Sequence, residues 1–467
     1  MTLTGWFPAF RGLRVPRHRA TTAQLCSAWP FLAEGGVSTR GAYLGVDVLA
    51  GGGGFAFDPF EAYAQGLVTN PNMVVAGEPG VGKSATIKCF LYRSAGVFGR
   101  WVAIADPKGE YRGLADALGL NVVKLHPGGP ARVNPLDPGP GGAPDGPEEL
   151  ARRQSTMVGA LLGSVLGRGL DPVEDAVVGW GLTHLARTLG GRAALADLAA
   201  VLVDPTAEMA ARARVEPAEL ARRAEAAVYA LDKLLDRSLR GMFDGPTTVR
   251  LDWSGPGLVL DLSCVHHDPQ ALALVMVAAS AWLQAVMARP DGPPRLQVLD
   301  EAWSLLGSGH TSRYLQSCWK LGRSYGVANI AVVHRLSDLR AQADDGTAIA
   351  KAGEGLLADT QTRVFFRQSS DQIPDAQRLL GLTRTEAALL SRLCRGRALW
   401  KIGARSAVVQ HVVGSREAFC DTDTRMTPNP GRFTPTDGAS AGNPRVDSES
   451  HRSSALGFGN SRGSSCA

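Results

Sequence analysis

Residues 73–84 carry glycine, lysine and serine at a spacing that suits the binding of a polyphosphate. Gly77, Gly82, Lys83 and Ser84 fill every fixed position of the phosphate-binding P-loop pattern. Glycines let the backbone wrap closely around phosphate oxygens, the lysine reaches the β- and γ-phosphates, and the serine holds Mg²⁺. The predicted nucleotide-binding residues of this loop are Gly77, Glu78, Pro79, Gly80, Val81, Gly82, Lys83, Ser84 and Ala85.

Two neighbouring acids, Asp300 and Glu301, follow the mostly apolar residues 296–299, which Gln297 interrupts. An apolar strand that ends in acids has the form of a Walker B motif. Asp300 is predicted to bind the water shell of Mg²⁺, and Glu301 to polarise the attacking water. The motif is weak alone, but a complete P-loop in the same chain strengthens it. Lys83 and Glu301 are therefore candidate catalytic residues, with Ser84 and Asp300 as metal ligands.

The elements predicted around these motifs alternate between strands and helices. Residues 73–76 form an apolar run before the P-loop, and residues 85–94 follow it with a helical rhythm. Further strands are predicted at 101–106, 121–125, 258–262, 296–299, 329–334 and 363–366, with a hairpin in 42–60 and a terminal pair at 398–402 and 407–413. This alternation predicts an α/β fold with a mostly parallel sheet covered on both sides.

The composition along the chain predicts five parts. Residues 1–40 are a poorly patterned extension. Residues 41–137 and 246–414 are expected to form one α/β core. Residues 138–245 begin with a Pro/Gly-rich linker and continue as an inserted all-α subdomain. Residues 415–467 are rich in Ser, Gly, Asn and Pro and are predicted to be disordered.

The overall composition is that of a globular protein. Of 467 residues, 45% are apolar, and a net charge of +5 is too small to argue for nucleic acid.

Seven scattered cysteines without a CxxC pattern indicate neither a zinc site nor a disulfide framework, which favours the cytoplasm. The N-terminus lacks a signal-peptide pattern. Residues 271–288 are long enough to span a membrane, but Gln284 and the flanking core strands favour a buried helix.

Arginine clusters occur in the predicted helical insertion. They could contact DNA, but acids stand beside them and no aromatic residues interleave, so solvated helix faces are the favoured interpretation. The clusters are Arg152-Arg153, Arg212, Arg214 and Arg222-Arg223.

The motifs together resemble those of the HerA/FtsK superfamily of P-loop motors. More narrowly, the chain resembles the TraC/TrbE class of cytoplasmic ATPases that energise conjugation and type IV secretion. The resemblance covers about residues 28–414, and DPKGEY together with DEAW is fairly specific to that class. It depends on the P-loop, DPKGEY (106–111), RVNPLD (132–137), DEAW (300–303), residues 323–335 and TRVFFRQ (362–368).

The resemblance implies a RecA-like motor domain that assembles into a hexameric ring and binds ATP and Mg²⁺ between subunits. Such a site needs an arginine from the neighbouring subunit, and the superfamily pattern points to Arg363 or Arg323; a surface ion pair is the alternative for each. His334 stands at the sensor position, which is usually Gln, and can still donate a hydrogen bond to a phosphate or to the lytic water. Glu110 lies just past the carboxyl end of the predicted strand 101–106, so it is expected to have a supporting role at the nucleotide or the subunit interface; a loop salt bridge is the alternative.

The function expected from this resemblance is an ATPase motor for conjugative DNA transfer or type IV secretion. Its partners would be other copies of itself and membrane components of the secretion system, with DNA as a further candidate. It would work in the cytoplasm, peripherally on the inner face of the plasma membrane. Two alternatives stay open: a soluble DNA pump of the HerA or FtsK type, and a nucleotide-gated scaffold that hardly hydrolyses ATP.

One further departure from the class bears on this expectation, and one feature argues against assigning the chain to the related coupling proteins. Only about 70 residues precede the P-loop, where the class commonly has a long N-terminal docking domain, so the docking part is expected on a separate chain. The related coupling proteins generally begin with transmembrane helices, and none is predicted here.

Overall fold

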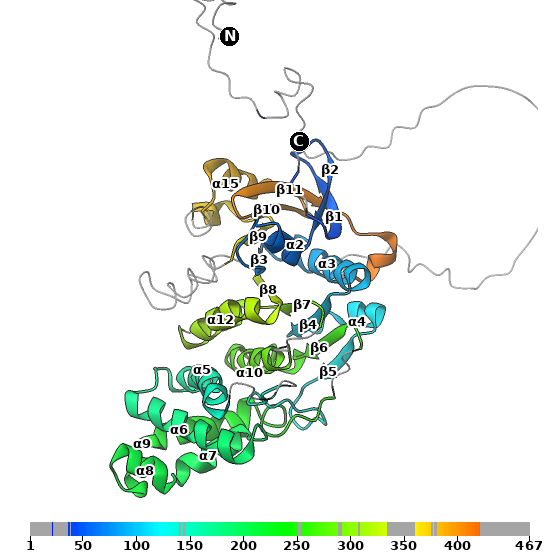
Figure 1. Cartoon of the computed structure of the whole chain (residues 1–467). Helices are drawn as coiled ribbons and strands as arrows, with labels where there is room; N and C mark the ends of the chain where they lie inside the picture. Colours follow the sequence, from blue (N-terminus) through cyan, green and yellow to red (C-terminus); the bar gives the residue numbers. More distant parts are fainter. Residues whose placement is uncertain are drawn as a thin grey trace, which may run out of the picture.

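An eleven-stranded mixed sheet organises the molecule (Figure 1). The computed structural model describes residues 39–139, 146–250, 254–287, 292–306, 309–333, 360–374 and 381–420, and single residues 21, 36, 37, 142 and 377. The strands are β1 (Ala42–Asp47), β2 (Gly53–Phe57), β3 (Met73–Ala76), β4 (Trp101–Asp106), β5 (Asn121–Lys124), β6 (Gly257–Asp261), β7 (Arg295–Leu299), β8 (Val327–Val333), β9 (Thr362–Phe365), β10 (Arg397–Ile402) and β11 (Arg405–His411). Their order is β2-β1-β11-β10-β9-β3-β8-β7-β4-β6-β5.

Seven adjacent strands, from β9 to β5 in this order, run parallel, which confirms the predicted mostly parallel sheet. The other four strands join antiparallel to the β9 edge. Ala76 at the end of β3 pairs with Val333 of β8, and Leu299 at the end of β7 pairs with Ala331 of the same strand. The carboxyl ends of β3 and β7 therefore meet at one edge of the sheet, with β8 between them.

Helices cover both faces of the sheet because successive strand side chains point to opposite sides. Met73 and Val75 pack in the core beneath one helical layer, whereas Val74 and Ala76 pack in the core beneath the other. The first layer contains α2 (Pro59–Ala64), α3 (Lys83–Phe98) and α4 (Arg112–Leu118), and the second α10 (Pro269–Met287), α11 (Trp303–Leu306) and α12 (Gly309–Gly322).

The predicted insertion is helical and lies beyond the second layer (Figure 1). Asp171 begins α6 with a capping box that includes Glu174, and the Thr206 side chain caps α8. Buried residues of the insertion belong to the same hydrophobic core as the second face of the sheet, so its helices extend that core. The helices are α5 (Pro147–Leu166), α6 (Pro172–Leu189), α7 (Leu195–Val203), α8 (Ala207–Ala213) and α9 (Pro217–Lys233), followed by a π-helix (Leu234–Ser238).

Helix α10 is long and apolar enough to cross a membrane, but it lies inside the protein. Trp282 on α10 and Trp319 on α12 are 0% and 1% exposed. The expected buried core helix is confirmed, and both tryptophans belong to the core.

The C-terminal part of the described chain corrects one expectation. Residues 415–467 were predicted to be disordered, yet Ser415–Cys420 form a 3₁₀ helix against α3. Arg93 of α3 holds this segment: its Nε donates to Glu417 Oε1 at 2.7 Å, and its Nη2 to the Val412 carbonyl at 2.7 Å. The disorder prediction used only the polar composition of residues 415–467, which carries no information about contacts with α3. Residues 421–467 and most of 1–40 lie outside the described part.

The remaining short elements are 3₁₀ turns and one helix near the sheet. The 3₁₀ turns are Ser263–Val265, Arg323–Tyr325 and Ser370–Gln372, and the helix is α15 (Arg384–Leu390).

Asn72 links three elements and provides a test of this packing. Its side chain is 1% exposed, accepts from the backbone and side-chain nitrogens of Asn329 at 3.1 Å, and donates to the Trp319 carbonyl at 3.0 Å. Asn72→Ala leaves these buried groups unpaired and should lower the free energy of unfolding by about 2–3 kcal/mol, measured by urea denaturation. Asn121→Ala, at an exposed site, should change it by less than about 0.5 kcal/mol. Equal effects of the two changes would contradict the linkage.

Candidate active site

The P-loop connects β3 to α3 at the carboxyl edge of the sheet. Gly80 and Gly82 have φ of +75° and +102°, a left-handed conformation that glycine adopts without strain. A Cβ on Gly77 would lie 2.5 Å from the Cβ of Phe366, so a larger residue has no room there. The loop is held from the side of β9, because the Glu78 backbone N–H donates to the Arg367 carbonyl at 3.2 Å. The predicted strand, loop and helix are all present.

Lys83 begins α3, and its side chain bends back over the loop. Its Nζ donates to the carbonyls of Gly77 at 2.6 Å and Glu78 at 2.7 Å. Burial lowers the pKa of Lys83 to about 8, although the nearby carboxylate of Asp300 opposes this shift. The ammonium is therefore only weakly solvated, which favours its transfer to phosphate oxygens.

Asp300 and Glu301 follow β7 at the same edge, and both are almost fully buried, at 3% and 2% exposure. Burial, and secondly the charge of Glu301, raise the pKa of Asp300 to about 6. Glu301 has φ of +53°; among the described non-glycine residues only Arg214 shares a positive φ, and it caps the end of α8. A left-handed backbone at a glutamate costs about 1–2 kcal/mol. The conformation that directs the Glu301 side chain into the site is therefore a strained one.

The oxygen ligands here suit Mg²⁺. The Ser84 hydroxyl and the Asp300 carboxylate are hard donors of the kind that this ion prefers. A divalent cation would also favour the ionised form of Asp300, which its burial opposes. The two predicted metal ligands thus fit the ion.

The loop after β4 contributes two charged side chains that the motif analysis left with secondary roles. Asp106 fixes the loop by accepting from the backbone N–H groups of Lys108 at 3.2 Å, Glu110 at 3.2 Å and Tyr111 at 2.9 Å. Lys108 Nζ forms an ion pair with Glu301 Oε1. Glu110 lies 3.6 Å from the Nζ of the buried Lys88 and also faces the P-loop cavity. Glu110 therefore makes a salt bridge, and its role beside a nucleotide stays a prediction.

A cavity of about 370 Å³ lies over the P-loop, and one of its walls was not predicted. The turn before β10 closes against the loop: the Gly396 N–H donates to the Val81 carbonyl at 2.9 Å. No local pattern marks this wall, since it lies more than 300 residues after the P-loop in the chain. The lining residues missed from sequence are Arg395, Gly396, His411, Val413 and Cys420.

The candidate arginines lie away from this cavity. Arg363 pairs with Val74, about 10 Å along the strand before Gly77, and its Nε donates at 2.8 Å to the Thr360 carbonyl, farther still from the P-loop edge. Arg323 is exposed at the amino end of β8. Neither is placed to serve the phosphate site of its own chain. His334 lies outside the described residues.

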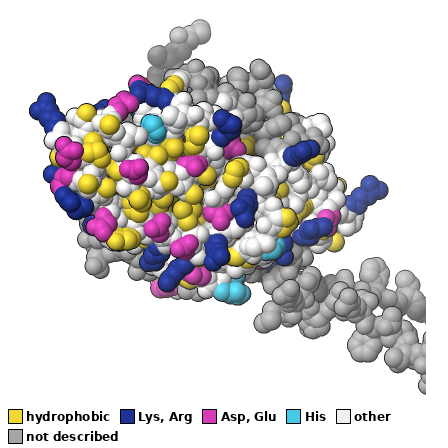
Figure 2. Space-filling model, turned by 90° about the horizontal axis from the view of Figure 1, so that it is seen from below, with side chains coloured by type: hydrophobic (Ala, Val, Ile, Leu, Met, Phe, Trp, Pro, Cys, Tyr) yellow, Lys and Arg dark blue, Asp and Glu magenta, His cyan; other side chains and the backbone are white. Residues whose placement is uncertain are grey.

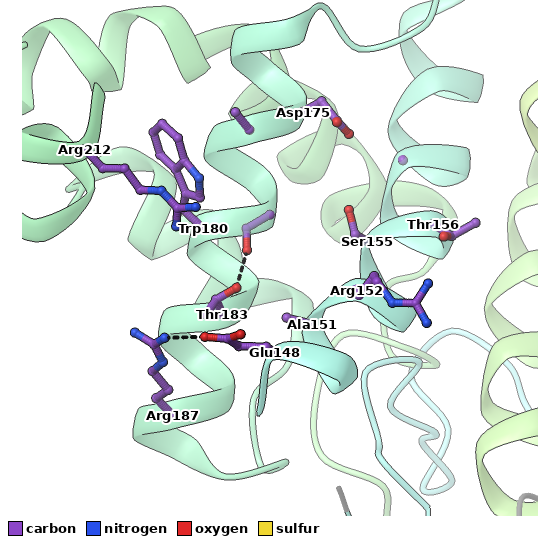
Figure 3. Close-up of a pocket in the computed structure, with 13 residues that line it drawn as sticks. Glu148, Ala151, Arg152, Ser155, Thr156, Asp175, Trp180, Thr183, Arg187 and Arg212 are labelled. Atoms are coloured by element: carbon purple, nitrogen blue, oxygen red, sulfur yellow. Dashed lines mark hydrogen bonds and ion pairs between the residues drawn. The ribbon is translucent and has the colours of Figure 1, made fainter. Parts of the chain in front are cut away.

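A second cavity, of about 670 Å³, lies between α5 and α6 (Figure 3). Arg212 stacks on Trp180, with its guanidinium 5.0 Å from the ring centroid, and Arg187 Nη2 lies 2.9 Å from Glu148 Oε1. Arg152 likewise pairs with Glu149 at 2.6 Å. Basic and acidic side chains also alternate over the face shown in Figure 2. Arg152 thus has an acidic partner, in line with the solvated-face interpretation, whereas Arg212 packs on an aromatic ring that this interpretation did not include.

Solved structures of VirB4 and TrwB share this fold. VirB4 of Thermoanaerobacter pseudethanolicus superposes with a TM-score of 0.63 and 20% identity, over 82% of this chain and 99% of that structure. The plasmid coupling protein TrwB, in complex with the non-hydrolysable ATP analogue ADPNP, superposes with a TM-score of 0.50 and 17% identity, over 73% and 85% of the two chains. The resemblance found in the sequence is confirmed at the level of the fold.

One curated protein is similar in sequence. The type IV secretion system protein CagE of Helicobacter pylori is 22% identical over 168 residues, which are 36% of this chain. The match spans only 16% of the length of CagE. No family model matches the chain.

The wall of the cavity should be sensitive to acid through His411. Its Nε2 accepts from Trp400 Nε1 at 3.0 Å, its Nδ1 lies 2.9 Å from the Gly396 carbonyl, and burial lowers its pKa to about 4. As the pH falls, His411 becomes protonated near pH 6.5 in the unfolded chain but only near pH 4 in the folded chain. The unfolding free energy therefore decreases as the pH falls from about 6.5 toward about 4. Between about pH 7 and pH 5, wild type should lose about 1–2 kcal/mol more unfolding free energy than His411→Gln.

Urea denaturation at the two pH values measures this difference. His267→Gln, at an exposed site, should retain the acid sensitivity of wild type. Identical pH dependence in wild type and His411→Gln would show that His411 is not the group responsible.

Proposed function

We propose that this protein is an ATPase of conjugation or type IV secretion that hydrolyses ATP with Mg²⁺. The observation that carries the proposal is the joining of three features at one sheet edge: the P-loop, the buried acids Asp300 and Glu301, and a cavity between the P-loop and the β10–β11 hairpin. The similarity in fold to VirB4 supports the biological setting.

Each residue of the edge has a role in this reaction. Backbone N–H groups of the P-loop and the first turn of α3 bind the phosphates, and Lys83 exchanges its bonds to the Gly77 and Glu78 carbonyls for bonds to phosphate oxygens. Ser84 and Asp300 would hold Mg²⁺, which would supply charge neutralisation for the transferred phosphoryl group. Glu301 orients the attacking water and draws its proton.

We further propose that the active form is a hexameric ring in which Arg363 or Arg323 completes a neighbour's site. Both arginines lie toward the amino ends of strands whose carboxyl ends border the P-loop, so a head-to-tail ring could present them to the adjacent subunit. The ring would act in the cytoplasm, docked peripherally on membrane components of a secretion system.

Purified wild type should turn over ATP, and Lys83→Ala should reduce turnover at least about a hundredfold because the phosphate charge is left without its cation. Glu301→Gln should bind ATP but lose about 10²–10⁴-fold in turnover. Lys124→Ala, which changes an exposed lysine at the end of β5, should behave as wild type. A coupled phosphate-release assay, with and without single- and double-stranded DNA, measures all four.

The outcomes separate the alternatives. Stimulation by DNA favours a DNA-translocating motor, either for conjugation or of the soluble pump type. Binding of ATP without turnover in the wild type would favour the nucleotide-gated scaffold. Failure of the wild type to bind ATP would refute the proposal.

Mixing experiments test the shared site. Arg363→Ala and Lys83→Ala should each be inactive alone. In an equimolar mixture about a quarter of the sites should be intact, because the P-loop of an Arg363→Ala subunit then meets the arginine of a Lys83→Ala subunit. The same mixture with Arg323→Ala tests the second candidate. Arg112→Ala, an exposed arginine paired with Asp116, should be active without mixing. If neither arginine variant is complemented, the trans assignment is wrong for both.

A further inference from the structure

Lys108 and Glu301 form an ion pair inside the candidate active site, at the border of the cavity over the P-loop. Glu301 is 2% exposed, so its carboxylate depends on a neighbouring cation for stability. Lys108 is 25% exposed and lines the same cavity as Lys83 and Ser84. One ammonium group therefore borders both the acid expected to activate water and the space expected to receive the phosphates.

The backbone that carries Lys108 is fixed, whereas its side chain is long and partly exposed. Asp106 accepts hydrogen bonds from three N–H groups of the loop, including that of Lys108 itself. Gly109 has φ of +69°, a left-handed conformation that favours glycine in this loop. A lysine has a flexible four-carbon stem and a compact charge, which allows its ammonium to change partners without backbone motion.

The ion pair also restricts what Glu301 can do. A carboxylate oxygen that accepts a charged hydrogen bond from Lys108 is a poorer acceptor for the proton of an attacking water. Burial alone would lower the pKa of Lys108, but the pair with Glu301 and the charges of Asp300 and Glu110 outweigh it and raise that pKa. Lys108 is thus a full cation that only another strong anion can draw away.

We propose that Lys108 is a γ-phosphate-responsive positioning residue: it engages Glu301 until a γ-phosphate competes for it, and then transfers its hydrogen bond to that phosphate and releases Glu301 to the attacking water. The inference rests on the proposed function. No covalent bond forms or breaks in the exchange. ADP lacks the competing group, so Lys108 makes the site discriminate between triphosphate and diphosphate, and it couples that recognition to activation of Glu301.

Binding measurements with a non-hydrolysable ATP analogue and with ADP, both with Mg²⁺, test the exchange on the full chain. Lys108→Met retains the length of the side chain and removes its charge. It should bind ADP within about twofold of wild type but bind the ATP analogue at least about tenfold more weakly. Lys108→Arg should recover part of the preference for the triphosphate, because a cation is restored. Lys124→Met is the matched control at an exposed lysine and should behave as wild type.

A double-mutant cycle isolates the competition with Glu301. Glu301→Gln removes the competing carboxylate charge and should raise affinity for the ATP analogue, but not for ADP, when Lys108 is present. The same change in a Lys108→Met background should leave both affinities unaltered. If Lys108→Met alone does not fold because it strands a buried carboxylate, the Lys108→Met/Glu301→Gln double variant can be compared with Glu301→Gln.

The possible results have distinct meanings. Loss of triphosphate preference together with the predicted coupling supports the exchange. Equal loss of affinity for both nucleotides would show that Lys108 only shapes the pocket, and unchanged affinities with faster turnover would show that it only restrains Glu301; either overturns the proposal. Failure of the wild type to bind any nucleotide would instead refute the proposed function.

Discussion

Two neighbouring carboxylates, Asp300 and Glu301, lie almost entirely out of water. The surrounding structure must compensate for the lost hydration of these two charges. Buried anions are stable only beside cations, metal ions or suitable hydrogen bonds. Lys108 pairs with one of the two, and burial raises the pKa of the other. Burial thus opposes the charged form of Asp300, and a divalent cation bound beside it would favour that form.

The parallel sheet brings these charges to the P-loop. β8 lies between β3 and β7, so the loop after β3 and the acids after β7 stand two strands apart at the same edge. The backbone of Glu301 departs from the usual region of φ in order to direct its side chain inward. Such strain is tolerated because the next residues are held by the sheet: the Ala302 N–H donates to the Val332 carbonyl at 3.0 Å.

Much of this arrangement could be predicted from the sequence because it depends on local patterns. The P-loop, the acids after β7 and the alternating buried strands each follow from residue type and short spacing. Most predicted strand boundaries fell within a residue or two of those observed, and the Trp101–Asp106 strand was predicted at its observed bounds.

The parts that could not be predicted depend on contacts between distant segments. Nothing near Gly396 indicates that its N–H meets Val81, and nothing near Glu417 indicates that Arg93 reaches it. The Lys108–Glu301 pair joins two motifs that were recognised separately, but their side-chain geometry follows only from the folded sheet. Low apolar content near residue 415 suggested disorder because composition carries no information about a tether supplied from α3.

The closure of the β10–β11 hairpin against the P-loop has a consequence for biosynthesis. The two sides of the cavity are separated by more than 300 residues, and β1 cannot complete its place in the sheet until β11 has been made. At a typical elongation rate, a ribosome needs on the order of tens of seconds to make the intervening chain. A nascent chain therefore displays its P-loop long before the second wall of the cavity exists, and nucleotide cannot stabilise the closed pocket until the β10–β11 hairpin has been made.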